Sequence, residues 1–206
     1  MTSDILIAVY DGLADWEIGY LTAGFNNPAF QLEPGRFRVR TVGVTADPIT
    51  TMGGLTVVPD LVLADTDVDG AALLVLPGAD SWLEGANTEF SAAAVRRLDA
   101  GAPVAAICGA TVGLAAAGAL DTRDHTGNAP EQLAFAPEYA GQVRFRPDRA
   151  VADQGLITAG AASPLEFAAE VFRALDLYAP DVLDAWYQLN VSGDPKWFFR
   201  LMELAA

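Results

Sequence analysis

Cys108 is the only cysteine of the chain, and it stands where a run of apolar residues gives way to very small ones. The apolar run 104–107 leads directly into the cysteine, and Gly109 and Ala110 follow it. This order is typical of a buried strand that turns sharply into a helix. A thiol at a helix N-terminus meets unpaired backbone N–H groups and the positive end of the dipole, which favour the thiolate. The sequence therefore predicts a reactive thiol.

The alternative for Cys108 is a structural role, since free cysteines are most often small buried apolar residues. Gly109 and Ala110 favour function, because they are small enough for the strained turn of a nucleophile elbow. We expect the backbone N–H of Gly109 to stabilise a developing oxyanion. A second donor is expected at the turn containing Gly78, where the missing side chain allows close backbone approach. The alternative for Gly78 is that it merely ends a strand.

Glu17 is the candidate carboxyl partner of the thiol. It lies early in a predicted helix, on the turn after the first apolar strand. If it points inward, burial raises its pKa and it can exchange a proton with Cys108. The competing interpretation is an exposed acid that complements the helix dipole. Asp15, two residues earlier, is the competing candidate for the same role.

His125 is the only histidine, so any mechanism that pairs cysteine with histidine must use it. It follows the cysteine after one predicted helix, which can return it to the same edge of a sheet. A structural role is the alternative, and it is the commoner one for a single histidine. One cysteine and one histidine do not provide a convincing metal site. Glycine-rich phosphate loops are also missing, so we expect neither a metal nor a cofactor.

Strands that are apolar throughout alternate with helices along the chain. This pattern indicates a parallel sheet buried on both faces. We predict a single α/β domain over residues 1–206, with a three-layer, doubly wound and mostly parallel sheet, helices on both faces and a flavodoxin-like arrangement. The predicted strands are 5–9, 37–44, 73–76, 104–107 and 156–160, with a hairpin at 50–58; the predicted helices are 14–25, 87–101, 110–120, one opening at Ser163, and 180–204 with a break at 193–195.

Four polar or glycine positions directly follow predicted strands. They are Asp11, Gly78, Cys108 and Gly160. In an open parallel sheet, ligands bind at the carboxyl ends of the strands. We therefore expect these four positions to surround one crevice.

The composition excludes several classes of partner. The formal net charge is −15, whereas nucleic acids and anionic membranes require basic surfaces. A single cysteine cannot form an internal disulfide, and the N-terminal segment lacks the basic start of a signal peptide. No apolar stretch reaches membrane-spanning length. We expect a cytoplasmic protein that acts on a small molecule.

Several segments together resemble the ThiJ/PfpI superfamily, whose fold is shared with class I glutamine amidotransferases. The resemblance runs through nearly the whole chain to about Leu175. It implies that Cys108 is the nucleophile or an oxidisable thiol, that Glu17 is its hydrogen-bonded partner, and that the protein is a homodimer. The matching segments are 5–9 with Glu17 downstream, 74–78, 105–109, 117–120, 126–128 and 156–160.

The chain departs from the family pattern at the residue after the cysteine. The peptidase-like branch carries histidine there, whereas this chain has Gly109. In another branch the histidine lies further downstream, at a place that falls near Gly127 or Asn128, and His125 precedes it by a few residues. The resemblance therefore implies a non-peptidase branch and a dyad of Cys108 and Glu17.

Three functions follow from these residues. The first is a cysteine-dependent hydrolase or lyase acting on a small amide, isonitrile or dicarbonyl compound, with Asp80, Ser81 and Trp82 lining the pocket. The second is a non-enzymatic stress protein whose cysteine is oxidised to a sulfinate. The third is a glutamine amidotransferase-like subunit, which requires a partner synthase. The aromatic C-terminal stretch, which comprises Trp186, Tyr187 and residues 197–202, is expected to pack on the sheet and is also a candidate dimer contact.

Overall fold

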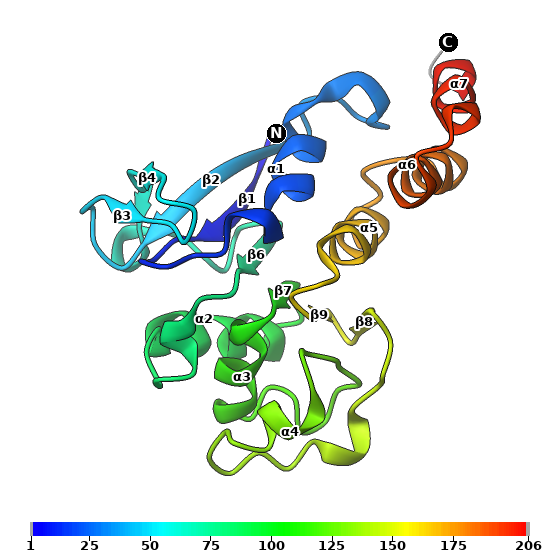
Figure 1. Cartoon of the computed structure of the whole chain (residues 1–206). Helices are drawn as coiled ribbons and strands as arrows, with labels where there is room; N and C mark the ends of the chain where they lie inside the picture. Colours follow the sequence, from blue (N-terminus) through cyan, green and yellow to red (C-terminus); the bar gives the residue numbers. More distant parts are fainter. Residues whose placement is uncertain (1, 205–206) are drawn as a thin grey trace.

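A seven-stranded sheet forms the centre of the protein, for which a computed structural model describes residues 2–204 (Figure 1). The strand order is β5-β2-β1-β6-β7-β9-β8, and every neighbouring pair is parallel except β8 with β9. A separate two-stranded hairpin pairs β3 with β4. The bounds are β1 (Ser3–Ala8), β2 (Phe37–Gly43), β3 (Ile49–Thr50), β4 (Thr56–Val57), β5 (Leu61–Val62), β6 (Leu73–Leu76), β7 (Val104–Ile107), β8 (Ala150–Asp153) and β9 (Leu156–Ala159).

Helices cover both faces of the sheet, as Figure 1 shows. Helices α1, α5, α6 and α7 contribute to the apolar core on one face, whereas α2 and α3 contribute to the core on the other. The bounds are α1 (Gly19–Asn26), α2 (Thr88–Asp99), α3 (Gly109–Ala116), α4 (Pro130–Leu133), α5 (Pro164–Ala174), α6 (Pro180–Ser192) and α7 (Pro195–Leu204). Short 3₁₀ turns occur at Asp15–Glu17, Pro28–Phe30, Leu63–Asp65, Asp80–Trp82 and Gln142–Arg144.

The central strands are apolar throughout because both of their faces are covered. In β6, Leu74 and Leu76 belong to the core that includes α2 and α3, and Leu73 and Val75 to the opposite core. This alternation follows from the period of two along a strand. The three-layer, doubly wound α/β fold predicted from the sequence is thereby confirmed.

The structure differs from the predicted elements near the N-terminus and at the sheet edges. The single helix expected over 14–25 is instead a 3₁₀ turn at Asp15–Glu17 followed by α1. Two strands at the edges of the sheet, β5 and β8, were not predicted. Both are short and only partly buried, so they lack the continuous apolar run that marks the central strands.

The helices of the described residues do not meet the requirements for a membrane-spanning helix. Within residues 2–204, no helix combines the length and the apolar character needed to cross a bilayer.

Candidate active site

Cys108 lies at the sharp turn between β7 and α3. Its backbone has φ 61° and ψ −127°, a region that residues with a side chain rarely occupy. The surrounding structure fixes this strained conformation: the Cys108 N–H donates to the carbonyl of Ala159 on β9 at 3.0 Å. On the helix side, the Thr111 hydroxyl donates to the Cys108 carbonyl at 2.6 Å. The geometry is that of the predicted nucleophile elbow, with a half-buried thiol at its tip.

Two glycines allow other segments to approach the elbow. A Cβ at Gly109 would lie 2.7 Å from the carbonyl oxygen of Ala79, which is a steric clash. A Cβ at Gly78 would lie 2.6 Å from Cys108 Cβ and 2.8 Å from its Sγ. The small residues at these two positions therefore bring the turn after β6 against the cysteine. This confirms that these two strand ends meet.

Glu17 is fully buried and lies beside the thiol. Its Oε2 accepts a hydrogen bond from the Gly78 N–H at 2.6 Å, while the Ala14 N–H donates to the Gly78 carbonyl at 2.9 Å. The broken first helix thus pairs with both backbone groups of Gly78. The second carboxyl oxygen, Oε1, is buried without a hydrogen-bond partner. Burial raises the pKa of Glu17 above its ordinary value of 4.5, although the Gly78 N–H and the neighbouring thiol act in the opposite direction.

The Cys108 thiol is held in its protonated form. Burial, as the larger cause, and the charge of the Glu17 carboxylate together raise the pKa of Cys108 from 9.0 to about 11. Hydrogen bonds from Asn128 and from the Gly109 N–H act in the opposite direction. The lowered pKa expected from the helix N-terminus is therefore not found, because desolvation and a neighbouring carboxylate outweigh the helix.

Asn128 is a site residue that sequence reasoning did not assign a role. Its Nδ2 donates to Cys108 Sγ at 3.4 Å, within the range for a bond to sulfur. Its Oδ1 accepts from the Ala161 N–H at 2.8 Å, which fixes the amide with its NH₂ group toward the sulfur. The only available signal was the family register, which placed a partner of the cysteine near Gly127 or Asn128.

The segment after β9 positions Asn128. A Cβ at Gly160 would lie 3.0 Å from the Gly127 carbonyl oxygen, so the missing side chain lets the two loops touch. The Trp16 indole, next to Glu17 in the chain, donates to the Ala161 carbonyl at 3.2 Å. The three segments that carry Glu17, Asn128 and Ala161 therefore form one hydrogen-bonded border around the thiol.

His125 is fully buried, and its hydrogen bonds go to groups other than the thiol. Its Nδ1 lies 2.7 Å from the Arg123 carbonyl, which can only accept, so Nδ1 carries the proton. Its Nε2 then accepts from the Tyr139 hydroxyl at 2.6 Å. Burial lowers the pKa of His125 below 6.5. The structure therefore gives His125 a satisfied, neutral environment and does not join it to Cys108.

The expected pocket residues after β6 have several different environments. The Gly78 N–H is engaged by Glu17, so its assignment as an oxyanion donor changes to that of a carboxyl anchor. Asp80 is exposed, and the Ser81 hydroxyl accepts from the Asn87 amide at 2.9 Å. Trp82 is almost fully buried, and its indole donates to the Pro77 carbonyl at 3.0 Å.

Asp11 and Asp15 hold the β3–β4 hairpin. Asp11 Oδ1 accepts from the Thr50 N–H at 2.8 Å, and Asp15 Oδ2 accepts from the Gly53 N–H at 2.6 Å. Asp15 therefore does not compete with Glu17 for the thiol. Within residues 2–204, no group of three or more histidine, cysteine, aspartate or glutamate side chains is arranged to hold a metal ion.

The fold and the elbow define a class of α/β proteins with one cysteine at the carboxyl edge of the sheet. The DJ-1/PfpI family model matches residues 3–174, and the chain belongs to this family. The chain is 39% identical over 203 residues to the "uncharacterized protease YoaZ" of Bacillus subtilis, covering 98% of this chain and 97% of that protein. It is 31% identical over 189 residues to YdeA of the same organism, also named an uncharacterized protease, covering 91% of each.

Two solved structures are similar along almost their whole length. A ThiJ/PfpI family protein from Bacillus anthracis is 40% identical, with a TM-score of 0.92 over 98% of this chain and 97% of that one. A DJ-1 superfamily protein from Agrobacterium tumefaciens is 32% identical, with a TM-score of 0.83 over 94% of this chain and 99% of that one.

Proposed function

We propose that this protein is a cysteine-dependent hydrolase or lyase that acts on a small electrophilic substrate such as an amide, an isonitrile or a dicarbonyl compound. One observation carries the proposal: Cys108 stands on a strained elbow with a buried carboxyl beside it and an amide donor at 3.4 Å from its sulfur. Backbone strain of this kind is retained where the surrounding structure enforces it, and it concentrates at reactive sites.

The chemistry needs a proton acceptor, because the thiol has a pKa of about 11 and is protonated at neutral pH. As Sγ adds to the substrate carbon, the thiol proton passes to the Glu17 carboxylate, the acceptor beside it. The negative charge moves to the substrate heteroatom, where the Gly109 N–H stabilises it. With an amide substrate, Glu17 then returns the proton to the leaving nitrogen. Water hydrolyses the resulting thioester.

The role of Asn128 is to stabilise charge on the sulfur, since an amide cannot accept the proton. A carboxamide NH₂ group is a neutral donor at all accessible pH values. The proton therefore has one acceptor, Glu17, and the site operates as a dyad. This assignment leaves His125 outside the chemistry.

We propose a small-molecule substrate rather than a protein, although the two Bacillus relatives carry the word protease in their names. The residue after the cysteine is Gly109, whereas the peptidase-like branch of the superfamily carries histidine at this position. The same absence of an imidazole beside Cys108 speaks against the glutamine amidotransferase-like alternative.

A redox-sensing role is the second candidate, and the Glu17 carboxyl favours it. The pKa of Glu17 is already raised by burial, and the negative charge of a sulfinate would raise it further, so that a protonated Glu17 could donate to an oxygen bound to sulfur. Oxidation by peroxide would add two oxygens to Cys108 and form a sulfinate. Glu17, Asn128 and the Gly109 N–H would then be its hydrogen-bond donors.

Turnover of a panel of small amides, isonitriles and dicarbonyl compounds tests the enzyme proposal. We expect at least one substrate class to be consumed, and Cys108→Ser to abolish its turnover. His125→Gln, which changes the other buried polar cluster, should retain most of the activity. The proposal is wrong if no compound is consumed while mild peroxide converts Cys108 to a sulfinate by mass spectrometry.

The homodimer stays a prediction. Helix α7 exposes Phe198, Phe199 and Met202, which supports a contact at this helix. Size-exclusion chromatography of Phe199→Asp should show dissociation if α7 forms the contact, and a monomeric wild-type protein would remove the prediction.

A further inference from the structure

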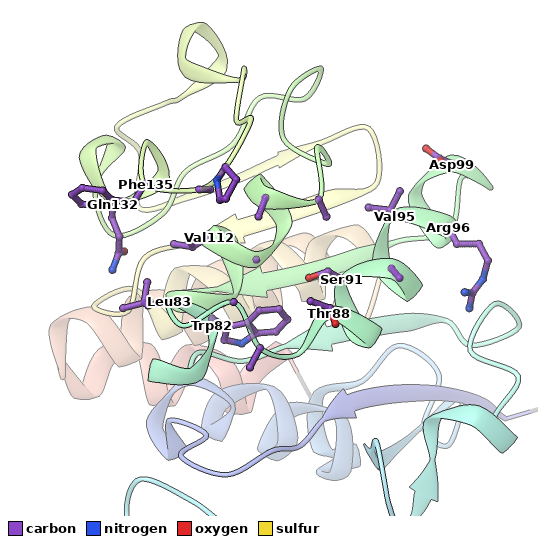
Figure 2. Close-up of a pocket in the computed structure, with 18 residues that line it drawn as sticks. Trp82, Leu83, Thr88, Ser91, Val95, Arg96, Asp99, Val112, Gln132 and Phe135 are labelled. Carbon is purple, nitrogen blue, oxygen red and sulfur yellow. The ribbon is translucent and has the colours of Figure 1, made fainter.

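A groove of about 930 Å³ lies between α2 and α3 (Figure 2). Cys108 does not line it. One end lies near Leu83 and Phe135, and the other near Arg96 and Asp99. Pockets that bind small organic ligands are of this size and are mainly apolar. The remaining lining includes Gly85, Ala86, Thr88, Ser91, Ala92, Val95, Val112, Gly113, Ala116, Ala117, Gln132, Ala136 and Pro137.

Trp82 forms a rigid part of the groove lining. A Cβ at Gly113 would lie 2.2 Å from the Trp82 ring, so the ring packs directly against α3 at this glycine. The indole nitrogen donates to the Tyr10 hydroxyl and to the Pro77 carbonyl, both at 3.0 Å. These bonds hold the indole in place, so that this almost fully buried side chain is a fixed element of the groove lining.

The walls leave space because their side chains are small. Ala92 on α2 and Ala116 on α3 are exposed alanines that line the groove from opposite helices. Larger apolar groups are left in contact with solvent at one end, where Leu83 is 52% and Phe135 is 83% exposed. A ligand seated there would cover apolar surface that nothing within residues 2–204 covers.

The charges of the groove indicate a neutral ligand. Its one basic group, Arg96, forms an ion pair with Asp69 at 3.0 Å, and Asp99 is the acidic group at the same end. An anion would gain little from a paired arginine in a chain of net charge −15. The opposite end holds Gln132, whose buried Oε1 has no hydrogen-bond partner. An N–H or O–H group on the ligand would supply the missing donor after a small rotation of the amide.

We propose that the groove between α2 and α3 is a second ligand site, which takes a neutral, largely apolar small molecule carrying one hydrogen-bond donor. The proposal does not rest on the chemistry proposed for Cys108. Trp82 is unsuitable as a test position, because its Pro77 contact lies on the same peptide whose Gly78 N–H holds Glu17. The exposed alanines are suitable, since larger side chains there fill the groove from the surface.

Fluorescence titration with N-phenyl-1-naphthylamine, a neutral diarylamine with one N–H group, tests the proposal. The protein is first alkylated at Cys108 with iodoacetamide, which blocks the catalytic site. We expect saturable binding of one probe per chain, and weakening of about tenfold or more in Ala92→Trp and in Ala116→Trp. The control Ala174→Trp places the same side chain at an exposed alanine of α5 outside the groove and should bind as wild type. Gln132→Met should also weaken binding.

Several results would overturn the proposal. They are the absence of saturable binding, unchanged affinity in both groove-filling variants that fold by circular dichroism, or binding that alkylation of Cys108 removes. Unchanged affinity in Gln132→Met would overturn the requirement for a donor. If a second copy of the chain covers the groove, probe affinity should fall as the protein associates. Ala92→Trp should then yield a monomer on size exclusion. That outcome also rejects a small-molecule site.

Discussion

Cys108 and His125 are both single residues of their type, yet their surroundings differ in one decisive respect. Both nitrogens of His125 have hydrogen-bond partners at 2.7 and 2.6 Å, and the ring is fully buried. Around Cys108 the backbone is strained, the residue is only partly buried, and Glu17 Oε1 is buried without a partner. A polar cluster that is fully satisfied stabilises the fold, whereas one left incomplete can still react.

Gly78→Ala should have the largest effect on the arrangement of Cys108 and Glu17. The added methyl group would lie 2.8 Å from both Cys108 Sγ and Glu17 Oε2, so one of them must move. A displacement of about 1 Å at reacting groups costs about 100-fold in rate, and we expect turnover to fall by at least that much. Steady-state kinetics on the substrate identified by the panel measures the effect.

The matched control for this variant is Gly19→Ala, because a Cβ at Gly19 meets nothing within 4 Å. Gly19→Ala should retain the wild-type rate. Equal rates for wild type and Gly78→Ala would show that the close approach of these groups is irrelevant to the chemistry.

His125→Phe tests the other side of the comparison. The change leaves the Arg123 carbonyl and the Tyr139 hydroxyl without their partner in a buried site, at about 1–3 kcal/mol for each group. We expect the free energy of unfolding to fall by about 2–4 kcal/mol in urea denaturation. The alkylation rate of Cys108 in the folded protein should stay unchanged. A large change in this rate with no loss of stability would instead place His125 in the chemistry.

The fold was predictable because its central strands carry a strong local signal. Residues 73–76 and 104–107 are apolar at every position, and both form strands with these bounds. Edge strands such as β8 are short and partly polar, so no continuous apolar run marks them. The first helix was mispredicted because its break depends on tertiary contacts, namely the pairing of Ala14 and Glu17 with Gly78.

The site residues that directly follow predicted strands could be located from the sequence. Cys108 and Gly78 each directly follow a predicted strand, and parallel strands end at one edge, whereas the pairing of Glu17 with the thiol was implied by the family resemblance. Asn128 lies on a loop, and its contact with the sulfur depends on the close approach of Gly160 to Gly127. The direction of the thiol pKa also escaped prediction, since burial and the position of a carboxylate are properties of the packed site.

The loss of folding stability at alkaline pH should distinguish the surroundings of Cys108 from those of His125. The pKa of Cys108 rises on folding from 9.0 to about 11, so in this interval the folded protein keeps a proton that the unfolded chain loses. The contribution of the thiol to stability is therefore lost as the pH rises from 9.0 toward 11. Urea denaturation should show a shallower alkaline decline in Cys108→Ser than in wild type, and identical declines would contradict the raised thiol pKa.

In the acid range, we expect His125 to lower the free energy of unfolding as the pH falls. Folding lowers the pKa of His125 below 6.5, so the unfolded chain binds this proton first and stability falls as the pH drops below 6.5. The pKa of Glu17 is raised on folding, so the folded state binds this proton first. Protonation of Glu17 therefore stabilises the folded protein as the pH falls toward 4.5, and it partly offsets the loss from His125. His125→Gln should flatten the decline just below pH 6.5, and an unaltered slope would contradict a buried neutral imidazole.

The pairing of Cys108 with an adjacent carboxylate is tested most directly by the pH dependence of Cys108 alkylation in wild type and in Glu17→Gln. We predict a wild-type midpoint near the thiol pKa of about 11, and a lower midpoint once the Glu17 charge is removed. A wild-type midpoint below the ordinary thiol pKa of 9.0, or one that Glu17→Gln leaves in place, would contradict the account.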